Sequence, residues 1–122
     1  MPSIDAIAGI SPTLATKLRK ARIRTTEALL KKGATRPLRK RLATATGLTE
    51  TQILLWVNRA DLMRVKGIGS EYSDLLEAAG VDTLKELKTR KAAALHSKLV
   101  EINTQKHLVR RLPPEAMVQA WL

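Results

Sequence analysis

The sequence contains no cysteine and no phenylalanine, and its aromatic residues are two tryptophans and one tyrosine. Without cysteine, the chain has no disulfide, no thiol nucleophile and no thiolate metal site. Without phenylalanine, its core must be built from Leu, Ile, Val and Ala, which suits short, closely packed helices. The scarcity of aromatic rings also disfavours binding of single-stranded nucleic acid by base stacking. Trp56 and Trp121 lie at helical spacing with aliphatic residues, so we expect both in the core.

Long hydrophobic runs are also missing. No stretch approaches the roughly 18 apolar residues that a membrane span needs, and the N-terminal segment lacks the basic region and apolar run of a signal peptide. We therefore expect a cytoplasmic protein without a membrane partner. At 122 residues, with 44% hydrophobic residues, the chain is long enough for one ordinary domain or two very small ones.

Acidic residues are scarce relative to basic ones, 11 against 22, and the net charge is +11. A protein this basic favours a polyanionic partner, above all nucleic acid. The charge is unevenly distributed. Residues 1–61 contain 12 basic and 4 acidic residues, a net of +8, whereas residues 62–122 contain 10 and 7, a net of +3. A basic protein without such a partner remains the alternative.

The two halves of the sequence resemble each other when one is shifted by 58 positions. The shift superposes Gly9 on Gly67, Ile10 on Ile68, Leu18 on Leu76, Ile23 on Val81 and Leu29 on Leu87; after one deletion, Leu38 meets Leu95 and Leu42 meets Leu99. Self-similarity of this kind indicates an internal duplication. We predict an all-α protein of two tandem units, residues 1–61 and 62–122, packed as one compact body because each half alone is of marginal size.

Capping residues and glycines predict where the helices begin and end. In the first half we expect a short helical segment at 4–8 and helices at 12–21, 25–33, 37–45 and 49–63. In the second half we expect helices at 70–79, 83–90, 92–102 and from 113 onward. Ser11 would cap the helix that Pro12 opens, and Thr49 and Gln52 have capping-box spacing. The helix at 49–63 would be shared by the two units.

The clearest local motif is Gly67-Ile68-Gly69, and Gly9-Ile10-Ser11 is its weaker copy. Gly67 and Gly69 both permit a positive φ and a close backbone approach, and Ile68 would hold the turn against the core. The helix that follows such a turn begins with free amide groups, which attract phosphate. The motif therefore predicts two helices joined by a tight hairpin.

These residues resemble the helix-hairpin-helix superfamily, and more narrowly the paired arrangement of the second domain of the Holliday-junction protein RuvA and the N-terminal domain of RecA-like recombinases. The segments GIG…LLEAAGVDTLKEL (67–87), LHSKLVEIN (95–103) and LVRRLP (108–113) are similar to an uncharacterised bacterial family of tandem helix-hairpin-helix proteins. The resemblance implies sequence-independent binding to the backbone of duplex DNA. Such domains also serve as protein-contact modules, which is the alternative.

The candidate nucleic-acid-binding residues fall into two groups. Backbone amides of the two hairpins would contact phosphates: Gly9, Ile10 and Ser11 in the first, and Gly67, Ile68 and Gly69 in the second, with Lys66 beside them. Outward-facing side chains would supply charge: Lys17, Arg19, Lys20, Arg36, Arg39, Lys40 and Arg41. Such contacts position a protein without reading sequence. A solvated helix face explains the cluster at 36–41 equally well.

Acidic residues follow the second hairpin, at Glu71, Asp74 and Glu77. They would repel a phosphate, so we expect the first hairpin to be the better contact, and the acidic surface could instead dock a basic protein partner. His96 and His107 have no metal-ligand spacing. We therefore expect no cofactor, no metal and no catalytic activity.

Overall fold

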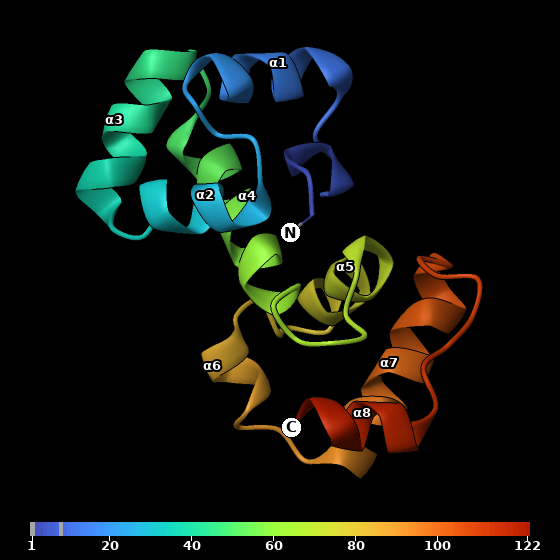
Figure 1. Ribbon diagram of the computed structural model, residues 1–122. Helices are drawn as coiled ribbons and strands as arrows, with labels where there is room; N and C mark the ends of the chain where they lie inside the picture. The colour runs from blue at the N-terminus through green and yellow to red at the C-terminus, as the bar shows by residue number, and fades with distance from the viewer. Residues whose placement is uncertain (1, 8) are drawn as a thin grey trace. The chain divides into compact units, whose positions relative to one another are not determined.

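The computed structural model describes residues 2–7 and 9–122. Within these ranges the chain forms one 3₁₀ helix and eight α-helices, and the only β-type pairing is an isolated bridge between Ser3 and Thr25. The all-α class is confirmed (Figure 1). The chain divides into two compact units, residues 1–61 (unit 1) and 62–122 (unit 2). It stays a prediction that each unit is a helix-hairpin-helix unit and that the two units pack as one body.

Unit 1 contains η1 (Ile4–Ala6), α1 (Pro12–Lys20), α2 (Thr26–Lys32), α3 (Arg36–Thr46) and α4 (Glu50–Leu62). Ala8, the last residue of the expected opening segment, lies outside the described residues. The side chains of Ser11 and Thr25 accept hydrogen bonds from amides three residues ahead, at 3.3 and 3.1 Å. Thr49 and Gln52 exchange the two bonds of a capping box, both at 3.1 Å. The predicted caps at Ser11 and at Thr49/Gln52 are confirmed, and Thr25 caps the helix expected to begin at this residue.

Unit 1 buries an aliphatic core. The largest fully buried side chains are Ile4, Ile7, Leu18, Ile23, Leu29 and Ile53. Trp56 is 3% exposed, which confirms its place in the core. Gly33, just after α2, marks a close approach: a Cβ there would lie 2.5 Å from Cγ2 of Val57 on α4. The end of α2 therefore packs against α4 so tightly that no side chain fits between them.

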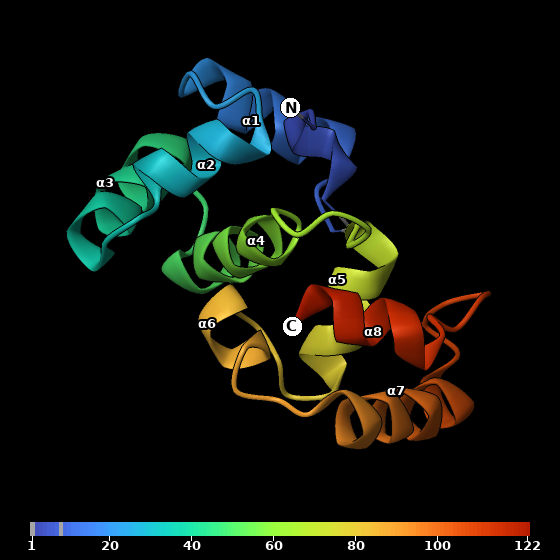
Figure 2. The ribbon, with the colours of Figure 1, turned by 60° about the horizontal axis from the view of Figure 1, so that its bottom comes forward.

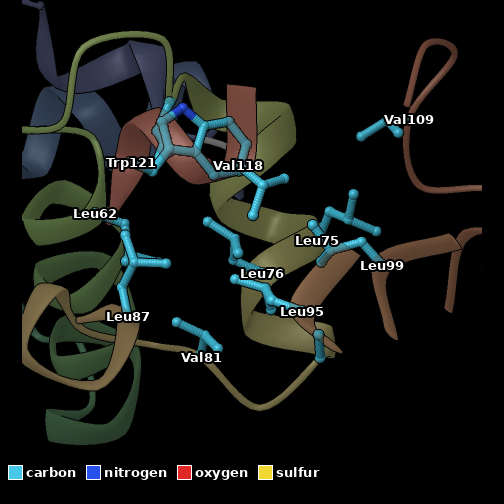
Figure 3. Close-up of a cluster of buried hydrophobic side chains, with 12 residues drawn as sticks. Leu62, Leu75, Leu76, Val81, Leu87, Leu95, Leu99, Val109, Val118 and Trp121 are labelled. Carbon is cyan, nitrogen blue, oxygen red and sulfur yellow. The ribbon is translucent and has the colours of Figure 1, made fainter. Parts of the chain in front are cut away.

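Unit 2 contains α5 (Ser70–Ala78), α6 (Leu84–Leu87), α7 (Ala92–Lys106) and α8 (Glu115–Trp121). Its core centres on Leu75 and Leu76 of α5, with side chains of α7 and α8 around them (Figure 3). Trp121 is 3% exposed, as expected. Met117, on the same helix, is 36% exposed. Helices α5 and α8 both contact α7 (Figure 2).

Two helix ends in unit 2 differ from the sequence prediction. Helix α6 ends at Leu87 and not near residue 90, because the amides of Thr89 and Arg90 bond three residues back, at 3.1 Å each. Helix α7 continues past residue 102 to Lys106. Its end is fixed by Asn103, whose side chain accepts from the amide of Val109 at 3.0 Å and donates to its carbonyl at 3.2 Å.

The backbone around the first helix of each unit recurs at a spacing of 58 residues (compare α1 and α5 in Figure 1). Helix α1 spans 12–20 and α5 spans 70–78, so both ends obey the spacing. The amide of Ile10 bonds to the carbonyl of Ile7 at 3.2 Å, and the amide of Ile68 bonds to that of Val65 at 3.1 Å. The turns that lead into the two helices therefore have the same hydrogen-bonding pattern.

The end of each of these helices repeats as well. The amide of Ile23 bonds to Leu18, and that of Val81 bonds to Leu76, both at 2.9 Å. In unit 2 the left-handed residue of this turn is Gly80, with φ +89. In unit 1 the same position is filled by Arg22, with φ +66.

Candidate nucleic-acid interface

The first glycine of each hairpin has a left-handed backbone, with φ +92 at Gly9 and +93 at Gly67. Both glycines also face a buried tryptophan. A Cβ at Gly9 would lie 3.5 Å from Nε1 of Trp56, and one at Gly67 would lie 3.3 Å from Nε1 of Trp121. Each hairpin therefore needs glycine for its φ, and each rests on the indole of the last helix of its own unit.

The second position of the two hairpins does not need glycine. Gly69 has an extended backbone, φ −100 and ψ −164, and no atom lies within 4 Å of where its Cβ would be. Ser11, at the same place in unit 1, is also extended, with φ −71 and ψ 166. The expectation that both Gly67 and Gly69 adopt a positive φ is wrong for Gly69. Serine is well suited to this N-cap position.

The isoleucine in each hairpin belongs to the core. Ile10 is 7% exposed and Ile68 is 4% exposed. Their amides donate to the carbonyls of Ile7 and Val65, inside the turns. Any amide that faces an anion must therefore come from the neighbouring residues and not from the isoleucines themselves.

The two helices that follow the hairpins offer different backbone donors at their first residues. In unit 1, Pro12 has no N–H, and the amide of Leu14 donates to the Ser11 side chain. In unit 2, the N-cap of α5 is Gly69, which has no side chain to accept a capping bond. Orphan amides at a helix start attract anions, so backbone donors favour unit 2.

Beside this hairpin of unit 2 lies an open hollow of about 370 Å³, lined by Gly67, Gly69, Ser70, Glu71 and Tyr72. The Tyr72 hydroxyl donates to the carbonyl of Arg111 at 3.1 Å. Its ring lies 5.6 Å from that of Trp121, tilted by 52°. Glu71 is exposed and contributes a negative charge to the hollow, so the half with the better backbone donors has an acidic group next to them.

Helix α1 of unit 1 displays the predicted basic side chains. Lys17 and Lys20 are exposed. The Nη2 of Arg19 lies 3.4 Å from Oδ2 of Asp5 on η1. A hydrogen bond with the Ser3 side chain is the main cause that lowers the pKa of Asp5; desolvation opposes it, and the positive charge of Arg19 lowers the pKa further. Arg19 thus holds η1 to α1, and its charge is partly compensated.

The predicted cluster on α3 divides in two. Arg36, Lys40 and Arg41 are exposed, as expected. Arg39 is half-buried, and its Nη1 donates to the carbonyl of Gly33 at 2.8 Å. The expectation that Arg39 faces outward is wrong, because its guanidinium satisfies a carbonyl at the end of α2. Helices α1 and α3 contact each other within unit 1, and Lys17, Lys20 and the α3 cations all belong to this unit. Lys66 is exposed and belongs to unit 2.

Sequence reasoning left Arg22 out of the candidate residues. Arg22 is exposed and has φ +66, a conformation that is uncommon for any residue except glycine. The matching position in unit 2 is Gly80. Comparison of the two halves at this position would have identified Arg22, because a glycine in one copy marks a left-handed turn residue in the other.

Among residues 2–7 and 9–122, no group of three or more His, Cys, Asp or Glu residues could hold a metal ion. Over the same residues, no helix combines the length and apolarity that crossing a bilayer requires.

A family profile described as "Domain of unknown function (DUF4332)" matches residues 8–122. No curated protein and no solved structure matches the chain significantly.

Proposed function

The chain belongs to the family described as "Domain of unknown function (DUF4332)", and we propose that it binds double-stranded nucleic acid without reading its sequence. In this proposal it is an accessory protein and not an enzyme. It grips the phosphate backbone of duplex DNA through hairpin amides and basic side chains. Each unit is a helix-hairpin-helix unit, and the two arose by duplication.

The observation that carries the proposal is the distribution of charge in unit 1. This unit has a net charge of +8, and basic side chains on two helices that contact each other are exposed: Lys17 and Lys20 on α1, and Arg36, Lys40 and Arg41 on α3. Positive charge gathered in this way attracts a polyanion and releases its counterions on binding. Arg22 extends the set beyond the end of α1.

The recurrence of backbone geometry supports the duplication. The hairpin glycines, their hydrogen-bonded isoleucines and the turns after α1 and α5 all repeat at one spacing. Leu62, the last residue of α4, lies in the buried core of unit 2. This placement supports a helix shared by the two units.

Unit 2 supports a second candidate, a protein-interaction module. Glu71 lines the hollow beside Gly67 and Gly69, where a phosphate would otherwise approach the amides. A basic segment of a protein partner would be attracted to this group, and a nucleic acid would be repelled. The two candidates therefore place the contact surface on different units.

Charge reversal on α1 tests the proposal. We expect Lys17→Glu/Lys20→Glu to weaken binding of a short DNA duplex strongly, measured by fluorescence anisotropy at 50 and 200 mM salt. Arg19 is left in place because it pairs with Asp5. The matched control, Lys85→Glu/Lys88→Glu, makes the same charge change at exposed residues in unit 2, and we expect a much smaller effect.

Salt dependence tests the mechanism. For the unmodified chain, the logarithm of the affinity should fall linearly with that of the salt concentration, by about 0.9 for each phosphate contact. The Lys17/Lys20 variant should have the shallower slope. Tight binding that is indifferent to salt would rule out a phosphate clamp. Unchanged DNA binding in this variant, with loss of a protein partner on Glu71→Lys, would favour the interaction module.

A further inference from the structure

We propose that unit 2 holds a phosphate-binding pocket between the end of α5 and the start of α7, separate from both hairpins. The pocket is a hollow of about 310 Å³ lined by Ala79, Arg90, Lys91, Ala94, Leu95 and Lys98. Three of these six residues are cationic and none is acidic. A water molecule occupies about 30 Å³ in the liquid, so the hollow has room for a phosphate group with part of its hydration shell.

The charge at the rim of the pocket faces an apolar floor. Ala79 and Leu95 are buried, and they form this floor. Lys91 and Lys98 are exposed, and the ammonium group of neither forms a hydrogen bond or ion pair with any residue that the structure describes. Low-dielectric walls strengthen the attraction between a charge and an anion. Because the two lysine side chains have no protein partner within residues 2–7 and 9–122, their charges are available to a ligand.

Arg90 is held at the side of the pocket by its own neighbours. Its Nη2 donates to Oε1 of Glu86 at 2.8 Å and to the carbonyl of Gly80 at 3.4 Å. Its Nε is buried and has no acceptor among the described parts of the chain. A guanidinium fork matches the oxygen atoms of a phosphate, and Arg90 lines the hollow, so its positive charge attracts an anion there although Glu86 partly compensates it.

The start of α7 adds backbone donors to these side chains. Lys91 is the N-cap of this 15-residue helix and makes no side-chain capping bond. The first intrahelical bond runs from the amide of Leu95 to the carbonyl of Lys91, at 2.9 Å. The amides before Leu95 have no partner inside the helix, and Ala94 lies in the pocket wall.

The matching region of unit 1 is basic too. At a shift of 58, Arg90 falls on Lys32, whose Nζ donates to the carbonyl of Ala21 at 3.0 Å, the same end of the preceding helix that Arg90 contacts. In the register that superposes Leu42 on Leu99, Lys98 falls on Arg41. By contrast, Lys85 falls on Glu27. Most cations of unit 2 have no cation at the matching position of unit 1, but Arg90 and Lys98 do.

The test follows inorganic phosphate binding to the full chain by ¹H–¹⁵N NMR, at constant ionic strength with chloride as the reference anion. We expect phosphate to shift the Nε–H signal of Arg90 and the amide signals of 92–95. Lys91→Gln/Lys98→Gln should weaken this binding roughly tenfold, as expected for losing two charge-assisted contacts. The control, Lys85→Gln/Lys88→Gln, removes the same charge from exposed positions of the same unit and should change little.

The pocket is ruled out if phosphate shifts are as large around Lys17 and Lys20 as around Arg90, or if the double variant binds phosphate like the unmodified chain. A second arm identifies the source of the phosphate group. If the pocket takes phosphates of a nucleic-acid backbone, the Lys91/Lys98 variant also loses affinity for duplex DNA and the control does not.

The two proposals can fail separately. If duplex DNA does not bind but inorganic phosphate shifts the Arg90 signal, the proposed function fails and the pocket stands as a site for a small phosphate compound. If duplex DNA binds through unit 1 and phosphate leaves the Arg90 signal unchanged, the proposed function stands and the pocket fails.

Discussion

The two hairpins have the same backbone and different chemistry. Gly9 and Gly67 have φ values of +92 and +93 and rest on equivalent tryptophans. After this point, unit 1 uses Ser11 and Pro12 at the helix start, whereas unit 2 uses Gly69 and places Glu71 in the first turn. Unit 1 therefore has fewer amide donors and more positive charge. The local fold and the electrostatic field of the two hairpins therefore depend on different residues.

The largest effects should come from the glycines that the two hairpins share. Gly9→Ala and Gly67→Ala should each destabilise the protein by about 1–2 kcal/mol, because a Cβ is disfavoured in the left-handed region. Urea unfolding followed by far-UV circular dichroism measures the loss.

The control for these variants is Gly69→Ser, which converts the second hairpin to the form of the first. Because Gly69 has an extended backbone and open space around it, serine should stabilise the protein by roughly 0.5 kcal/mol through capping and reduced unfolded-state freedom. Equal losses in Gly67→Ala and Gly69→Ser would contradict the distinction drawn between the two positions.

A smaller effect should follow from exchanging the residues that end α1 and α5. Arg22→Gly should raise stability by about 0.5–1 kcal/mol, since the left-handed strain that it removes outweighs the extra unfolded-state freedom of glycine. In the nucleic-acid proposal the same variant binds duplex DNA less tightly. Thermal unfolding and fluorescence anisotropy measure the two changes.

The reciprocal variant, Gly80→Arg, should destabilise unit 2. Gly80 has φ +89, and a residue with a Cβ is disfavoured in this left-handed conformation. An Arg22→Gly variant that is less stable than the unmodified chain would show that the arginine makes a favourable contact and is not simply strained.

The smallest effect concerns acid pH. The pKa of Asp5 is lowered by its hydrogen bond with Ser3 and by the charge of Arg19. A carboxylate with a lowered pKa contributes stability above its unfolded-state pKa and loses it as the pH falls through the folded-state value. Asp5→Asn should therefore lower the thermal midpoint slightly at neutral pH and not at all at strongly acidic pH, in parallel scans. A loss that persists unchanged in acid would mean that the ion pair is not its cause.

Features that depend on neighbours in sequence could be predicted. Ser11 and the pair Thr49/Gln52 act within one helical turn and were identified as caps, and Thr25 was identified as the start of a helix. The buried isoleucines and tryptophans followed from apolar spacing. These features require only local geometry and the period of a helix.

Features set by distant contacts could not be predicted. The conformation of Gly69 depends on how its turn leads into α5, and Arg39 turns inward because the end of α2 presents the carbonyl of Gly33. Helix α7 runs beyond its last apolar residue, and its end is fixed by the bonds between Asn103 and Val109. The hollow around Arg90 combines residues of α5 and α7, so no single stretch of sequence contains it.

The tryptophan beneath each hairpin has an optical consequence. The chain has two tryptophans, and Trp56 and Trp121 belong to different units, each beside its own hairpin glycine. Replacing either with phenylalanine leaves one indole whose emission reports on one hairpin alone. In unit 2, the ring of Tyr72 lies 5.6 Å from Trp121, close enough to transfer excitation to it. Fluorescence can therefore follow the two halves of this chain separately, without any added label.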